Sequence, residues 1–175
     1  MDFEKFEKNI GFTLIEIMIV IGIIGTVMMM SIGSYGSVMR NSRDAQRQSD
    51  LKKIRAALEQ YYVDHDTFNV TGGGWYNGGN GWVGYENGTS YATSVTRALR
   101  NQGYLTVPLI DDPIQSPGYM IYTCSGGQIF SLSATLENPT PEETEFARDH
   151  TCNGNGGNGT VTRYGKNYAI TNQAL

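Results

Sequence analysis

The N-terminal part of the chain carries a long run that is apolar on all sides. From Phe12 to Met30 the residues are apolar or small, apart from the mildly polar Thr13 and Thr26 and the charged Glu16. Nineteen residues of this kind can cross a hydrocarbon core of about 30 Å as a helix. A cleavable secretory signal has a shorter apolar region and a small-residue cleavage site after it. The pattern therefore predicts a membrane-spanning helix.

The apolar run passes into an amphipathic pattern without a helix-breaking residue. Segment 40–50 is polar on every side, and its charges are spaced so that they can pair on one helix face. An apolar stripe at helical spacing follows. Because no proline occurs over 12–63, the sequence predicts one helix of about 78 Å, whose first half needs lipid or other helices around it. The expected pairs are Arg40 with Asp44 and Arg47 with Asp50, and the stripe consists of Leu51, Ile54, Leu58 and Tyr61.

The rest of the chain predicts loops, a second helix and a small antiparallel sheet. Two β-rich runs are joined by Ser125-Gly126-Gly127, which indicates a hairpin. A long helix followed by a small sheet defines the α+β class. The expected order is a glycine-rich loop at 64–91, a short helix at 92–102 that ends near Gly103, strands at 118–124 and 128–136, a polar loop at 136–149 and a final strand within 161–170.

Composition narrows the classes of function. The 175 residues allow one domain of ordinary size and a membrane-associated segment. A net charge of −4 gives no nucleic-acid footprint over the whole chain. The two histidines, His65 and His150, belong to no recognisable nucleophile motif, so the sequence predicts no enzyme activity.

The cysteines and the basic residues give opposite indications of topology. Cys124 and Cys152 lie in a Gly/Asn-rich part of the chain and indicate one disulfide if that part is exported, or two thiols if it is cytosolic. Lys5 and Lys8 precede the apolar run, whereas six basic residues follow it within 40–55. The positive-inside rule alone would place the C-terminal part in the cytoplasm. The choice between these orientations depends on a sequence motif.

Residues 11–16 read GFTLIE and are followed directly by the apolar run. This motif resembles the N-terminus of type IV pilins and of the pseudopilins of type II secretion systems. The resemblance continues over 43–65 and returns at 103–113, and beyond about 136 it is mainly architectural. It implies a long N-terminal spine helix packed on a small antiparallel sheet, with an exported C-terminal loop that a disulfide between Cys124 and Cys152 would close.

The resemblance also implies a processing pathway. A prepilin peptidase would cut between Gly11 and Phe12 and methylate the new N-terminus on Phe12. Residues 1–11 would be a leader, 12–39 the transmembrane and filament-core half of the helix, and 40–175 the globular domain with its own helix half at 40–63. The implied partners are identical subunits, the peptidase, a pilus assembly platform with its ATPase, and membrane lipid before assembly. The implied locations are the inner membrane and then an extracellular filament.

Glu16 is a carboxylate in an apolar run, where an unpaired charge is costly. We expect it to pair with the positive amino terminus of a neighbouring subunit, which would neutralise both charges and set the axial register. Because each subunit carries both groups, the contact is head-to-tail and generates a helical filament. The alternative is a residue near the membrane interface that is favoured at the helix N-terminus by the helix dipole.

The glycine-rich loop carries aromatic residues that suit surface binding. Trp75, Tyr76, Trp82 and Tyr85 lie among asparagines and glycines, an arrangement that suits contacts with a glycan. Alternatively, they pin the loop to the domain or to a neighbouring subunit. The corresponding alternatives for the whole chain are a monomeric, membrane-anchored glycan-binding module and a pseudopilin of a secretion or DNA-uptake system.

We predict no cofactor and no metal site, with calcium as the alternative. The hard oxygen ligands that calcium prefers occur in two groups, although without the spacing of an EF-hand. The basic residues within 40–55 suggest contact with anionic lipid or DNA as one interpretation. A solvated or subunit-facing helix surface is the favoured interpretation. The oxygen-rich groups are Asp111-Asp112 and Asn153, Asn155 and Asn158.

Overall fold

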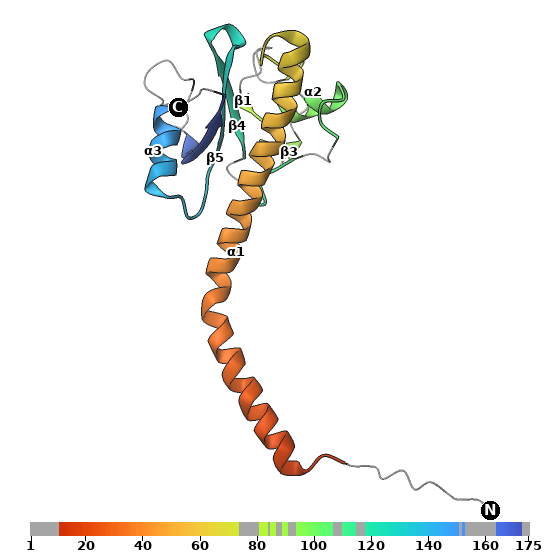
Figure 1. The fold of residues 1–175 in the computed structure, drawn as a ribbon, viewed down its shortest axis with the longest axis vertical. Helices are drawn as coiled ribbons and strands as arrows, with labels where there is room; N and C mark the ends of the chain where they lie inside the picture. The colour runs from red at the N-terminus through yellow and green to blue at the C-terminus, as the bar shows by residue number, and fades with distance from the viewer. Residues whose placement is uncertain are drawn as a thin grey trace, which may run out of the picture. The chain divides into compact units, whose positions relative to one another are not determined.

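Two units make up the chain, Met1–Met39 and Arg40–Leu175. Their elements are drawn in Figure 1 from a computed structural model. This structure describes residues 11–73, 81–83, 85–86, 89–90, 94–106, 110–114, 118–150, 152 and 164–172.

Helix α1, Leu14–His65, contributes to both units and confirms the predicted uninterrupted helix. In the first unit its large apolar side chains from Leu14 to Met29 are exposed all round the helix. The sequence predicts a membrane span within 12–39; among the residues that the structure describes, no helix is both long enough and apolar enough to cross a membrane.

The second half of α1 provides one side of the hydrophobic core. All four residues of the predicted stripe are fully buried there, and they pack with apolar side chains of the sheet. Burial of a side chain of this size contributes about 1.5–3 kcal/mol. The stripe residues are Leu51, Ile54, Leu58 and Tyr61, and the core residues of the sheet include Ile121, Phe130 and Leu132.

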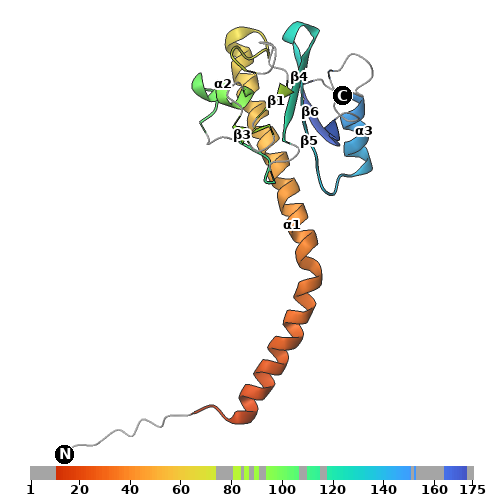
Figure 2. The ribbon, with the colours of Figure 1, turned by 180° about the vertical axis from the view of Figure 1, so that it is seen from behind.

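The main sheet is antiparallel with the strand order β1-β4-β5-β6. Ile121 pairs with Leu132, and Leu132 pairs in turn with Ile170, so all three share the face that meets α1. The predicted hairpin turns at η1, Ser125–Gly127, where Gly126 and Gly127 adopt the positive φ angles that glycine tolerates. The strands, which Figure 2 shows from behind, are β1 (Gly81–Trp82), β4 (Met120–Cys124), β5 (Ile129–Ala134) and β6 (Tyr168–Thr171).

The short helix is confirmed as α2, Val95–Asn101. Ser94 caps it by accepting a hydrogen bond from the Arg97 amide, so the helix begins later than predicted. Gly103 follows its end with a φ of +87°, as expected after a helix.

Two segments that we predicted as loops contain regular structure. The segment 64–91 holds three two-residue strands, β1 and the separate pair β2 (Tyr85–Glu86) and β3 (Thr89–Ser90). The segment 136–149 holds helix α3, Pro141–Asp149. Thr140 and Glu143 form a capping box there, and Pro141 stands in the first turn. The predicted loop at 136–149 was therefore wrong.

Candidate functional site

The N-terminus of α1 is fixed by a capping box. The Thr13 amide and hydroxyl both donate to Glu16 Oε2, at 2.8 and 2.6 Å, and the Glu16 amide donates back to Thr13 Oγ1 at 3.3 Å. This reciprocal arrangement satisfies amide groups that a helix start otherwise leaves without partners. Glu16 therefore lies in the first turn of α1 and takes part in its capping.

The capping box leaves part of the Glu16 carboxylate unused. Both bonds from Thr13 end on the same oxygen, and Oε1 accepts no hydrogen bond within the described chain. A carboxylate carries about four acceptor positions. Glu16 can therefore keep its cap and still accept a second, cationic donor, and the intersubunit pair remains a prediction.

The predicted cleavage site lies just before the helix. Gly11 and Phe12 are exposed, and the Phe12 side chain retains 84% of its accessible surface. The helical bonding of α1 starts downstream, where the Ile17 amide donates to the Thr13 carbonyl at 3.3 Å. The bond between Gly11 and Phe12 therefore lies outside the helix, and both of its residues are exposed.

The first unit presents an apolar surface with few polar interruptions. Its large side chains remain 46–84% exposed from Phe12 to Met29. The Thr26 hydroxyl donates to the Ile23 carbonyl at 2.8 Å, so its polarity is satisfied by the helix itself. An exposed apolar surface of this extent indicates contact with another protein surface or with lipid.

The second unit contains a buried ion cluster that sequence reasoning missed. The Arg47 side chain is 1% exposed and binds Asp112 through two hydrogen bonds of 2.8 and 3.2 Å. It also donates to Asp44 at 2.7 Å and to Glu137 at 3.1 Å. The predicted pairing of Arg47 with Asp50 is therefore wrong, because Arg47 turns inward to three other carboxylates.

The cluster changes the interpretation of the polar helix segment. Asp44, which we paired with Arg40, instead binds Arg47, and Asp50 binds Lys53 at 2.9 Å and accepts from the Tyr119 hydroxyl at 3.2 Å. Segment 40–50 is thus partly buried and is not a uniform solvated face. Local spacing could not indicate this burial, because two of the partners of Arg47, Asp112 and Glu137, lie 65 and 90 residues away.

Hydrogen bonds and burial shift the pKa values of groups in and near this cluster. The hydrogen bond from Arg43, and then that from Arg47, lower the pKa of Glu137 to about 2. Burial lowers the pKa of Lys166 to about 7, against the opposing effect of the Asp112 charge. The Lys166 ammonium donates a hydrogen bond to the Gly118 carbonyl. The hydrogen bonds of the cluster join α1 to distant segments of the second unit.

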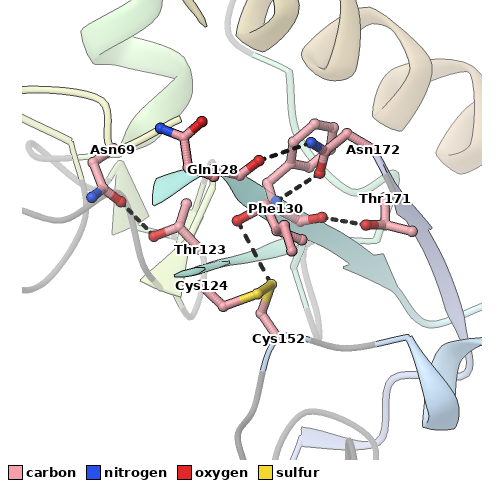
Figure 3. Close-up of a disulfide and its surroundings, with 9 residues drawn as sticks. Asn69, Thr123, Cys124, Gln128, Phe130, Cys152, Thr171 and Asn172 are labelled. Atoms are coloured by element: carbon pink, nitrogen blue, oxygen red, sulfur yellow. Dashed lines mark hydrogen bonds between the residues drawn. A yellow bond between two sulfur atoms is a disulfide. The ribbon is translucent and has the colours of Figure 1, made fainter. Parts of the chain in front are cut away.

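The predicted disulfide forms between Cys124, at the end of β4, and Cys152. Their Cα atoms are 5.4 Å apart and the bond joins positions 28 residues apart in sequence. Figure 3 shows it beside the β5 backbone, where Asn172 and Thr171 bond to Phe130. The bond joins Cys152, which follows α3, to the end of β4 in the sheet.

The remaining predicted sites fall wholly or partly outside the described residues. Trp75 and Tyr76 are outside them, and for Trp82 and Tyr85 the structure describes the backbone in β1 and β2 but not the side chains. The three asparagines of the calcium alternative, Asn153, Asn155 and Asn158, are also outside. Both oxygens of Asp112 accept from Arg47. Within the described ranges no group of three His, Cys, Asp or Glu side chains is arranged to hold a metal.

Comparisons with known proteins give two sequence matches, one to the N-terminal motif and one to most of the chain. Residues 8–32 match the family model of the prokaryotic N-terminal methylation motif. The chain is 26% identical over 146 residues to the type IV major pilin protein PilA of Myxococcus xanthus (strain DK1622). This match covers 79% of the chain and 59% of the relative, so the chain spans less than two thirds of that protein. No solved structure matches the chain.

The motif and the relative make the chain similar to type IV pilins, and its α+β fold with a disulfide is pilin-like.

Proposed function

We propose that the chain is a structural subunit of a type IV pilus. Its precursor is cut between Gly11 and Phe12 by a prepilin peptidase, methylated on Phe12 and polymerised through the first half of α1. The observation that carries this proposal is the exposed apolar surface of α1, which begins directly after the methylation motif and its capped N-terminus.

Polymerisation would bury the apolar surface of the first unit. Identical helices can cover one another's apolar side chains, and each large side chain removed from water contributes about 1.5–3 kcal/mol. Because the surface is apolar on every side of the helix, one subunit can pack against several neighbours at once. This geometry favours a helical bundle over a simple dimer.

Glu16 sets the register in this proposal. Cleavage creates a positive amino group on Phe12, and the same group of a neighbouring subunit can reach the free oxygen of the capped Glu16. The contact is between unlike parts of identical subunits and does not close, which is the condition for a filament.

The location and further partners follow from the family. The precursor is held at the inner membrane, with lipid around the first half of α1, and the assembled filament is extracellular. Assembly uses the platform and ATPase that serve type IV pili. The Cys124–Cys152 bond supports export of the second unit, since disulfides persist in oxidising compartments.

The first experiment is mass analysis of the N-terminus of protein sheared from the surface of the source cells. We expect a chain that starts at N-methyl-Phe12 and is recovered in the sheared polymer. A chain that starts at Met1 and stays in the membrane fraction would contradict the proposal and favour a monomeric anchored module.

A paired substitution tests the role of Glu16 separately. Glu16→Leu should still be cut but should lower the filament yield by at least about a hundredfold, since loss of one partner of a buried charge pair costs about 3–5 kcal/mol. Met18→Leu, an apolar exchange in the same helix, is the matched control and should assemble normally. Equal yields from the two variants would remove Glu16 from the assembly mechanism.

A further inference from the structure

Strand β6 forms the end of the main sheet. It pairs with β5 along one edge, and no strand of the described chain pairs with its other edge. The outer edge of a terminal strand can pair with a strand of another chain. In a protein that polymerises, this edge offers a second route of association beside helix packing.

Helix α3 stands beside this edge. Among the strands it packs chiefly against β6, and both ribbon views show it at the end of the sheet opposite β1 (Figures 1 and 2). Burial and then the negative charge of Glu143 raise the pKa of Tyr168, which agrees with a β6 residue adjacent to α3. A helix over an edge strand is a known way to block edge pairing.

The helix itself contributes little apolar burial. Of its nine residues, all within the described chain, Ala147 is the one that is buried. An isolated helix of this length is marginal in water. Its position beside β6 must therefore depend on what holds its two ends.

The N-terminal end is held by α1. Asp44 accepts hydrogen bonds from the backbone amides of Glu137, at 2.9 and 3.1 Å, and of Asn138, at 2.9 Å. Arg43 forms two bonds of 2.6 Å to the Glu137 carboxylate. Further along, the Gln48 amide donates to Glu143 at 3.1 Å. These contacts fasten the segment between β5 and α3 to the first turns of the second unit.

The C-terminal end is held by a covalent bond. Cys152 follows three residues after the end of α3 and is joined to Cys124 at the end of β4. The helix is therefore attached on both sides, by charge-assisted hydrogen bonds before it and by the disulfide after it.

We propose that α3 is an edge guard, which these two attachments hold against β6 so that a strand of a second copy of the chain cannot pair there. The guard thereby confines polymerisation to α1, a consequence that rests on the proposed filament function. When the attachments are lost, α3 leaves β6 and the second unit associates with another copy through its sheet edge.

The test uses the full chain in detergent, with Glu16→Leu in every variant to disable assembly through α1. Glu137→Gln weakens the first attachment, and Cys124→Ser with Cys152→Ser removes the second. Glu59→Gln is the matched control, because it makes the same exchange in the exposed pair of Arg55 and Glu59. Backbone hydrogen exchange is compared between the peptides 164–172 and 120–124, and the association state is measured by light scattering.

Glu137→Gln should speed exchange in 164–172 by roughly tenfold, the factor for one charge-assisted hydrogen bond, while 120–124 changes little. The variant that combines Glu137→Gln with both cysteine substitutions should also form dimers, whose fraction rises with protein concentration. Equal exchange in the control and in all variants would overturn the guard, and so would a uniform rise in both peptides. If the cysteine variant does not fold, Glu137→Gln alone decides between these outcomes. Failure of helix-driven assembly is measured separately on the chain that retains Glu16. That chain would then remain monomeric.

Discussion

Thr13 and Glu16 form the smallest part of the structure that bears on assembly. Two donors of Thr13 hold one oxygen of Glu16, so the carboxylate has a fixed position before any second subunit arrives. Side chains that are already ordered lose less conformational entropy when they bind. The threonine thus prepares the glutamate for the intersubunit pair that we propose.

This arrangement predicts different effects of two substitutions at Thr13. Thr13→Val removes the hydroxyl and should weaken the helix start by about 1 kcal/mol, whereas Thr13→Ser retains the cap. We expect lower filament yield from the valine variant and near-normal yield from the serine variant. Amide exchange at residues 14–16 reports the cap directly. Equal exchange and equal yield in both variants would show that the hydroxyl does not position Glu16.

At the scale of elements, the sequence predicted what depends on local spacing. The stripe from Leu51 to Tyr61 identified the buried face of α1, and Ser125-Gly126-Gly127 identified the hairpin. The burial of Arg47 could not be predicted, because its partners Asp112 and Glu137 lie 65 and 90 residues away. Helix α3 was missed for another reason, since its capping signal was present but its composition is polar on nearly every side.

Arg47 of α1 forms a buried ion pair with Asp112, and removing this pair should strongly lower the stability of the second unit. Arg47→Ala should destabilise the second unit by about 3–5 kcal/mol, because it leaves the Asp112 carboxylate buried without the guanidinium that binds it. Arg55→Ala, in an exposed pair, should cost less than about 1 kcal/mol. Urea denaturation of the full chain in detergent, followed by tyrosine fluorescence, measures both. Similar midpoints for the two variants would mean that the cluster contributes little.

At the scale of the whole molecule, the shifted pKa values define a pH range of stability. Glu137 has its pKa lowered to about 2, so its contribution is present above the ordinary value of 4.5 and is lost as the pH falls toward 2. Lys166 has its pKa lowered to about 7 from 10.5. Between the lowered and the ordinary pKa of Lys166, this side chain binds a proton in the unfolded chain but not in the folded chain. The free energy of unfolding therefore rises with pH over that range.

Lys166 provides the test of this pH dependence. Lys166→Met removes the titrating group and should flatten the rise in the free energy of unfolding between about pH 7 and pH 10. Urea midpoints of the wild type and the variant at both pH values measure the slope. An unchanged slope in the variant would assign the pH dependence to another group.

The sharing of α1 between the two units has a mechanical consequence. A pull on the first unit reaches the second along the backbone of this helix, and Arg43, Asp44 and Arg47 form ion pairs near the start of the second unit. Arg43 and Arg47 form hydrogen bonds to Glu137 and Asp112, two residues that lie far apart in the sequence. Tension is therefore divided among several segments of the chain at the start of the second unit, before it reaches the hydrophobic core.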